Sequence, residues 1–193
     1  MSYITEAINK WGKCRTGAIT MYGAGVGVYG NSGYAYTGST PSKLKKRIEE
    51  ANSSNAEITD INITENGNYV IILGGSGYWT LGYPDAFLKK LEQYRTGDLR
   101  DDNILSACFN DRGEWVVITD KHYSYSNETI KNFILKAEEL YEEVYYAYIT
   151  NYGMIACCKN GVYYKNIPSN LAEALKKLTF KPKVIKFTDN GLY

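Results

Sequence analysis

The sequence predicts an α+β fold made of about four tandem β-β-β-α repeats, with short antiparallel strands and outer helices. Three observations predict it. Tight-turn signals recur every 38 to 46 residues. Each turn separates two strand-like runs, and a short aromatic run and an amphipathic helical pattern follow them. The turn glycines are Gly23, Gly67, Gly113, Gly153 and Gly191.

The first strand of each repeat precedes its turn and mixes apolar with polar residues, as a half-exposed strand does. The predicted runs are 58–64, 104–109, 144–150 and 184–188, with 15–20 as a weaker first copy. The turn itself carries Asn-Gly or Asp-x-Gly in most copies, because glycine accepts the positive φ that hairpin turns require.

The second strand of each repeat is apolar on consecutive residues, so both of its faces should be covered. These runs are 69–73, 115–118 and 154–158, and we expect them to be the central strands. A second turn then leads to a short aromatic third strand, at 34–36, 78–80, 123–125 and 163–164.

A helix closes each repeat. Pro41, Pro84 and Pro168 mark the first helical turn, where the missing N–H of proline costs nothing. In the third copy, Ser126 or Asn127 should cap the helix instead. The charge-rich segment 43–47 contains Lys43, Lys45, Lys46 and Arg47, and we expect it to be the solvent-exposed face of a helix.

The repeats divide a single domain of 193 residues into copies at about 13–56, 57–100, 101–142 and 143–180. Residues 1–12 have the pattern of a helix without its preceding strands, and 181–193 that of a first strand and its turn. Together these terminal segments would form a partial fifth unit. The repeats could then close as a pseudo-symmetric, α/β propeller-like toroid, and an open stack with capped ends is the alternative.

Composition limits the classes of function. The net charge is +1, from 22 basic and 21 acidic residues, so nucleic-acid binding is not expected. The chain lacks an apolar run of the length that a membrane helix needs, and we expect a soluble, cytoplasmic protein. Four cysteines without a Cys-x-x-Cys pair, together with the single His122, predict buried free thiols, with no metal site and no cofactor.

The first copy is unusually rich in glycine. Gly25 and Gly27 occupy the places of Tyr69 and Ile71, so two large side chains are missing from one face of a central strand. We expect a ligand pocket over these glycines, or a neighbouring aromatic such as Trp11 or Tyr22 that fills the gap. Segment 25–30 also matches G-x-G-x-x-G, but no helix follows it directly, as a dinucleotide loop would require.

The third strands form the second candidate site, because the chain has 19 tyrosines and the repeats would present aromatic rings at equivalent places. Rings beside Ser, Asn and Gly suit stacking combined with adaptable hydrogen bonds. The alternative is that half or more of the rings pack under the helices. The candidate ligand-binding residues are Tyr34, Tyr36, Tyr78, Trp79, Tyr123, Tyr125, Tyr163 and Tyr164.

From these features the sequence favours a non-catalytic binding module that recognises a small molecule, a glycan or a nucleotide-like ligand. The first alternative is a protein–protein interaction or structural module. The second is an enzyme in which His122 lies within hydrogen-bond reach of Cys108, Cys157 or Cys158.

Overall fold

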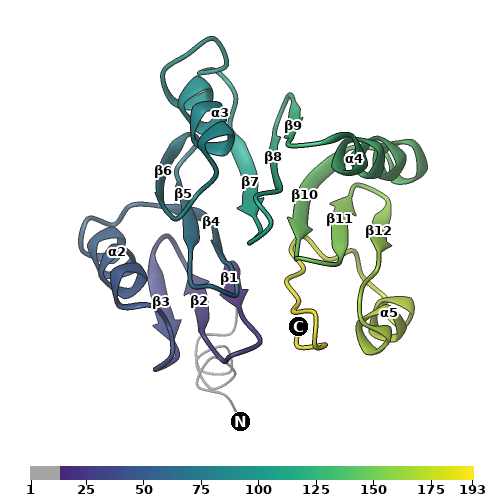
Figure 1. The fold of residues 1–193 in the computed structure, drawn as a ribbon, viewed down its shortest axis with the longest axis horizontal. Coiled ribbons are helices and arrows are strands. Elements are labelled where there is room, and N and C mark those ends of the chain that lie inside the picture. The colour runs from purple at the N-terminus through teal and green to yellow at the C-terminus, as the bar shows by residue number, and fades with distance from the viewer. Residues whose placement is uncertain (1–13) are drawn as a thin grey trace.

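A computed structural model describes residues 14–193 and confirms an α+β fold of four repeated units, each a three-stranded antiparallel sheet with a helix (Figure 1). The sheets are β1 Thr16–Ile19, β2 Gly25–Tyr29 and β3 Gly33–Tyr36; β4 Ile58–Ile63, β5 Tyr69–Leu73 and β6 Gly77–Leu81; β7 Ile104–Phe109, β8 Trp115–Thr119 and β9 Tyr123–Tyr125; β10 Val144–Ile149, β11 Met154–Cys158 and β12 Gly161–Lys165. The helices are α2 Ser42–Ser53, α3 Asp85–Arg95, α4 Glu128–Tyr141 and α5 Ser169–Lys176.

The second strand of each sheet is the central one, as the consecutive apolar residues predict. Strands β5 and β8 pair on both sides and are buried along nearly their whole length. The first strands lie innermost, where β1, β4, β7 and β10 contact one another in that order. Strands β4, β7 and β10 are buried at all but one position, so the expectation that the first strands are half-exposed is wrong. Among the strands of residues 14–193, ladder hydrogen bonds join only members of the same sheet, so these four sheets are separate from one another.

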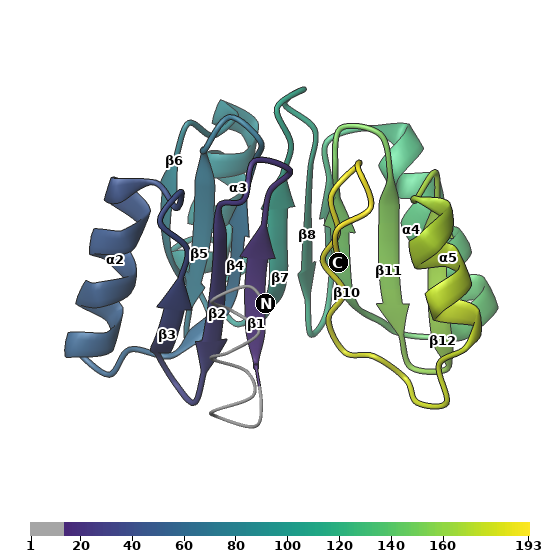
Figure 2. The same cartoon turned by 90° about the horizontal axis from the view of Figure 1, so that it is seen from below.

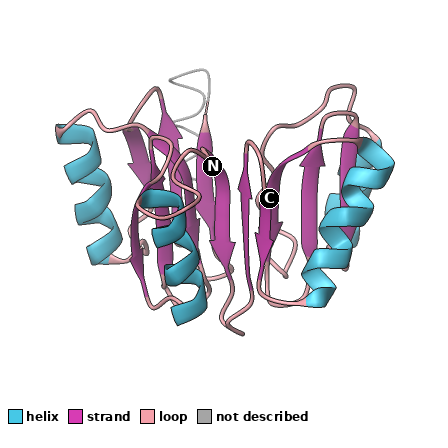
Figure 3. Cartoon of the chain, turned by 90° about the horizontal axis from the view of Figure 1, so that it is seen from above, coloured by secondary structure: helices cyan, strands magenta, loops and turns pink. Residues whose placement is uncertain are grey.

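The helices lie on the outer side of the sheets (Figure 3). Helix α2 buries Leu44, Ile48 and Ala51 against residues of both the first and the second sheet. Helix α3 packs in the same way between the second and third sheets. Helices α2 and α3 therefore each cover the sheet that follows as well as their own, and this arrangement positions the site described below.

The helix starts match the proline signals with a shift of one residue. Pro41, Pro84 and Pro168 stand at the cap position rather than in the first turn. In the third unit Asn127 is the cap, and its side chain accepts a hydrogen bond of 3.0 Å from the Ile130 N–H.

The hairpin turns at the end of the inner strands share one geometry, with one exception. Gly23, Gly67, Gly113 and Gly191 all adopt φ between 79° and 90°. Gly153 does not, because its turn is one residue shorter: Thr150 N–H bonds the carbonyl of Gly153 itself. The expectation that all five glycines bend the backbone alike is therefore wrong at Gly153.

The C-terminal segment runs beside β10 toward the centre of the molecule (Figure 2). Residues 184–188 are not assigned as a strand, contrary to the expected first strand of a fifth unit, but the turn after them is present: Thr188 N–H bonds Leu192 O at 2.9 Å. The helix expected within residues 1–12 lies outside the described residues. Among the described helices, none is long and apolar enough to cross a membrane.

Candidate functional site

A groove of about 430 Å³ lies between α2 and the outer strand of the second sheet, β6. That volume is within the range of small-molecule sites, about 300–1,000 Å³. Depressions beside α5 and beside β11 are smaller, at about 220 and 150 Å³. We call this feature the basic groove, and it is lined by Lys43, Lys46, Arg47, Glu50, Tyr69, Tyr78, Trp79, Thr80, Leu81, Tyr83 and Leu88.

The helix α2 supplies the charged wall of the basic groove. Lys43, Lys46, Arg47 and Glu50 are three and four residues apart, so they share one face of the helix. The buried residues of α2 fix its opposite face against the sheets. Three positive charges therefore face the groove against one carboxylate, and these residues were expected from the sequence only to be a solvated helix face.

The floor of the basic groove is β6, which pairs with β5 alone and so is the edge of its sheet. Trp79 packs with the cluster under α2, and the Arg47 guanidinium lies 5.1 Å from the centre of its ring. Arg47 also forms an ion pair of 2.7 Å with Glu50, and that hydrogen bond raises the pKa of Arg47. The indole and the guanidinium are thus held together at the groove.

In the third and fourth units, other side chains occupy the position on the outer strand that corresponds to Trp79. Trp79 pairs with Ile71, and the corresponding residues are Ser124, opposite Val117, and Tyr163, opposite Ala156. Tyr94 of α3 bonds Ser124 at 2.7 Å, and the Phe133 ring of α4 lies 5.0 Å from that of Tyr163. Uncharged side chains close those two positions, whereas α2 presents Arg47 and leaves a groove.

Tyr78 lies on the other face of β6, with the cluster under α3. Its hydroxyl donates a hydrogen bond to Glu92 of α3, and Arg95 lies 5.6 Å from its ring. Burial and the Glu92 carboxylate raise the pKa of Tyr78 to about 12. The phenol is therefore protonated at neutral pH, and Tyr78 is one of the residues that line the groove.

The other predicted aromatic residues are not brought together with Tyr78 and Trp79. Tyr34 and Tyr36 stack on each other at 5.4 Å on β3, and the Tyr36 hydroxyl donates to Glu49 of α2 at 2.8 Å. The remaining four pack partly buried against the largest core cluster, and they are Tyr123, Tyr125, Tyr163 and Tyr164. Their role in ligand binding stays a prediction.

Gly25 and Gly27 are both buried within β2. Gly27 faces Gly17 across the ladder, and a side chain at Gly17 would meet the Val26 carbonyl oxygen at 2.7 Å. This close approach of β1 and β2 is one physical reason for glycine in the first unit. The predicted pocket over Gly25 and Gly27 remains a prediction.

His122 forms its hydrogen bond with a buried carboxylate, since its Nδ1 lies 2.6 Å from Asp102 Oδ2. The Cys108 and Cys158 thiols point at the carbonyls of Ala147 and Ala137 instead. Burial raises the pKa of the Cys108 and Cys157 thiols to about 12 and that of Cys158 to about 11. In the described part of the chain these contacts do not include a Cys–His pair.

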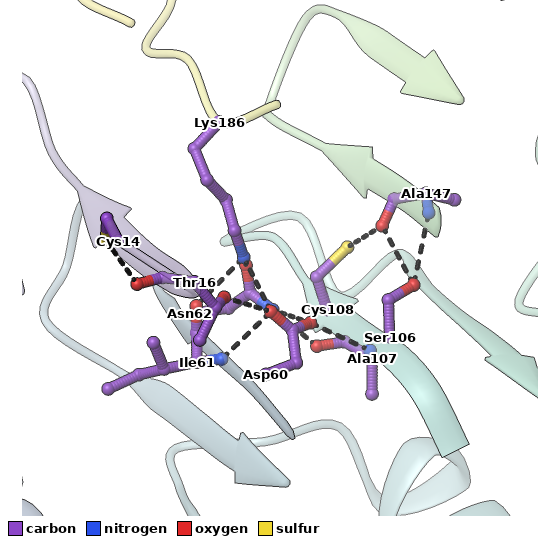
Figure 4. Close-up of polar contacts among 10 residues, drawn as sticks. All are labelled: Cys14, Thr16, Asp60, Ile61, Asn62, Ser106, Ala107, Cys108, Ala147 and Lys186. Carbon is purple, nitrogen blue, oxygen red and sulfur yellow. Dashed lines mark hydrogen bonds and ion pairs between the residues drawn. The ribbon is translucent and has the colours of Figure 1, made fainter. Parts of the chain in front are cut away.

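A buried polar cluster lies at the centre of the molecule, where Lys186 of the C-terminal segment reaches β4 (Figure 4). Its ammonium donates to Asp60 Oδ1 at 3.0 Å, to Ile61 O at 2.9 Å and to the side-chain oxygen of Asn62. The Tyr146 and Tyr148 rings flank it at 5.3 and 5.0 Å. All three ammonium donors are used, so the cluster serves to join segments of the fold.

The sequence reasoning did not single out this central cluster. The sequence does contain a signal for it, because polar residues occur in segments that lie at the centre of the molecule. These residues are Asp60 and Asn62 in β4 and Lys186 in the last segment. Burial lowers the pKa of Lys186, and the Asp60 carboxylate opposes that shift. The likeness of the repeats could have identified these positions as inward-facing.

Comparison with known proteins gave no matching family model, no matching curated protein and no matching solved structure. The functional argument therefore depends on the geometry of the basic groove.

Proposed function

We propose that the protein is a non-catalytic binding module whose basic groove binds a small anionic ligand with a planar ring, such as a nucleotide. The observation that carries the proposal is the joint presence of Lys43, Lys46 and Arg47 beside Trp79 in one groove of about 430 Å³. Lysine and arginine donors suit phosphate and carboxylate oxygens, and aromatic rings suit planar groups.

The two parts of such a ligand would have separate contacts. The anionic part would bind the exposed ammonium groups of Lys43 and Lys46 and the guanidinium of Arg47. The planar part would pack beside Trp79 and Tyr83 on the floor of the groove. Because the Arg47–Glu50 pair already exists, the guanidinium is partly oriented before a ligand arrives.

The test is calorimetric titration with three probes: ATP, tripolyphosphate as the anion alone, and adenosine as the ring alone. We expect ATP to bind more tightly than either part. Lys46→Gln and Trp79→Ala should each weaken ATP binding by roughly tenfold, since a charge-assisted hydrogen bond or a stacked ring contributes about 1–3 kcal/mol.

The repeats provide matched controls. Lys89 of α3 is exposed and stands five residues after Pro84, as Lys46 stands five after Pro41. Tyr163 is the residue equivalent to Trp79 in the fourth sheet. Lys89→Gln and Tyr163→Ala should leave the affinity unchanged, and equal losses in both sets, or no binding of any probe at 10 mM, would disprove the proposal.

A protein-interaction role has one observation in its favour. Phe180 is 66% exposed beside a depression lined by Tyr164, Leu175 and Leu178. Apolar groups that remain exposed together mark partner surfaces. Phe180→Ser should then abolish any self-association seen by light scattering. A wild-type chain that is monomeric at all concentrations would exclude self-association through this surface.

A further inference from the structure

The C-terminal segment takes the place of a fifth inner strand. Its turn closes like those of the first three units, since Thr188 N–H bonds Leu192 O at 2.9 Å. In each of the four units a second strand follows this turn and pairs with the inner strand. Within residues 14–193, by contrast, no hydrogen bond joins the backbone of residues 184–187 to another backbone group. We call the backbone of residues 184–187 the open edge.

The side chains of this segment alternate between two environments, as those of a strand do. Ile185 and Phe187 are buried in the core cluster to which Leu171 of α5 also belongs. Lys186, which stands between them, reaches Asp60 at the centre of the molecule instead. A strand added beside the segment would therefore place every second side chain on the side of α5.

The hydrogen-bonding groups of the open edge point in a definite direction. The Thr188 N–H closes the turn, so it points to the place of a second strand. In an extended backbone alternate residues point the same way, and the N–H and C=O groups of Val184 and Lys186 therefore point there too. The Ile185 N–H points elsewhere, since it faces the Cys157 thiol, whose pKa burial raises and this N–H lowers. Two residues thus offer a donor and an acceptor each to an added strand.

Helix α5 is less covered than the other described helices. Of its eight residues only Leu171 is buried, whereas α2 and α3 each bury three residues and α4 buries four. The Asn170 side chain of α5 donates to Gly191 O at 2.8 Å, which ties the helix to the turn after the C-terminal segment. An added strand would give α5 the second sheet on which α2 and α3 pack.

The surface around the open edge has a local excess of positive charge. Residues 174–188 contain five lysines and neither aspartate nor glutamate, although the whole chain has a net charge of only +1. Three of these lysines are exposed and form no ion pair with a described residue, and they are Lys176, Lys177 and Lys183. Such a surface attracts acidic partners and repels basic ones.

From these contacts we propose that the open edge binds an extended acidic segment of another protein, which adds to it as an antiparallel strand. An unpaired strand edge is a template for this mode of binding. The backbone groups of Val184 and Lys186 bond the added strand. Its apolar residues lie opposite Ile185 and Phe187 and face α5. Its acidic residues follow toward its C-terminal end, where an antiparallel strand passes Lys183.

The test uses a fluorescein-labelled peptide in which isoleucine and threonine alternate over six residues and three glutamates follow. Titration with the full chain, followed by fluorescence anisotropy, should show saturable binding. Replacement of the three glutamates by lysines should abolish it. Because the basic groove contains no residue of the C-terminal segment, ATP binding and peptide binding are independent results.

Backbone methylation of the peptide separates strand addition from attraction between charges. With isoleucines opposite Ile185 and Phe187, the threonine N–H groups bond the open edge and the isoleucine N–H groups point away from it. N-methylation of the threonines should weaken binding at least roughly tenfold, because each one removes a hydrogen bond. N-methylation of the isoleucines is the matched control and should leave the affinity unchanged.

Amide hydrogen exchange measured by NMR locates the bound peptide on the chain. The Val184 and Lys186 amides should exchange at least roughly tenfold more slowly in the complex, since they then form ladder hydrogen bonds. The Ile185 and Phe187 amides point to the other side, and their exchange should not change.

A pair of charge reversals tests the basic surface. Lys176→Glu with Lys177→Glu should weaken peptide binding at least roughly tenfold, because two attractive charges become repulsive. Lys89→Glu with Lys90→Glu makes the same change on α3 and should leave the affinity unchanged.

Three results would overturn the proposal. One is the absence of saturable binding at millimolar concentrations of the chain, and another is equal binding of the two methylated peptides. The third is slow exchange of the Val184 and Lys186 amides in the free protein, since the open edge would then be occupied by this chain itself or by a second copy.

Discussion

The Lys186 ammonium lies 3.0 Å from the Asp60 carboxylate, although the two residues are 126 positions apart in the chain. The Lys186 side chain is 8% exposed and that of Asp60 is 1% exposed. The same carboxylate accepts hydrogen bonds from Thr16, Asn62 and the Ala107 N–H. One buried ion pair therefore links the C-terminal segment to the inner strands of three sheets.

Breaking this pair should destabilise the whole domain. Lys186→Met leaves Asp60 as a buried charge without its cation, and we expect a loss of about 3–5 kcal/mol in the free energy of unfolding. Lys183→Met, which removes an exposed lysine three residues earlier, should change it by less than about 0.5 kcal/mol. Urea unfolding followed by circular dichroism measures both, and equal stabilities would show that the pair contributes little.

The double change Asp60→Asn with Lys186→Met distinguishes the charge effect from a loss of packing. Because it removes both buried charges, it should recover part of the stability that Lys186→Met alone loses. If the double variant instead loses as much stability as Asp60→Asn and Lys186→Met lose separately, added together, the broken ion pair is not the cause of the destabilisation.

The thiols provide a test of the enzyme alternative. At pH 8 a thiol with a pKa of about 12 is ionised in only about one molecule in ten thousand. Cys108, Cys157 and Cys158 are also buried, whereas Cys14 is exposed. We therefore expect one thiol to react quickly with Ellman's reagent in the native protein and all four in urea.

Cys14→Ser should remove that fast phase and leave the rest unchanged. Raising the pH from 8 to 9 should accelerate the buried thiols only in proportion to their thiolate fraction, about tenfold. A second thiol that reacts quickly at pH 7 would mean an activated cysteine, and would favour the enzyme alternative over the binding module.

The need for glycine at the hairpin turns can be tested by comparing a turn glycine with another glycine that has as much room for a side chain. A methyl group at Gly113 or at Gly38 would meet no atom within 4 Å, but only Gly113 has a positive φ, of 79°. Gly113→Ala should thus cost about 1–2 kcal/mol through backbone strain. Gly38→Ala should be neutral or stabilise by up to about 1 kcal/mol, and a similar loss at both positions would contradict the strain argument.

Much of the fold could be predicted because the same sequence pattern occurs in several repeats. The consecutive apolar residues at 69–73 and 115–118 identified central strands, and the aromatic runs identified the outer strands. The exception, Gly153, could not be foreseen, since the loss of one residue after a turn changes its closure without changing the local residue types.

The candidate site could be predicted only in part. Tyr78 and Trp79 were proposed from their repeated position, but the charges of α2 were expected only to face solvent. The sequence does not say which sheet a helix covers, and the groove exists because α2 packs against the sheet that follows it. Lys186 was missed for a similar reason, because its partner Asp60 comes from a distant strand.

The most direct test of the basic groove is ¹⁹F NMR of protein labelled with 5-fluorotryptophan and titrated with ATP. The chain has three tryptophans, and a phenylalanine change at each one assigns the signals. We predict that the Trp79 signal moves with saturable dependence on ATP, and that the signal of buried Trp115 does not. A Trp79 signal that stays fixed while ATP binds, or that moves equally in Lys46→Gln, would contradict the account.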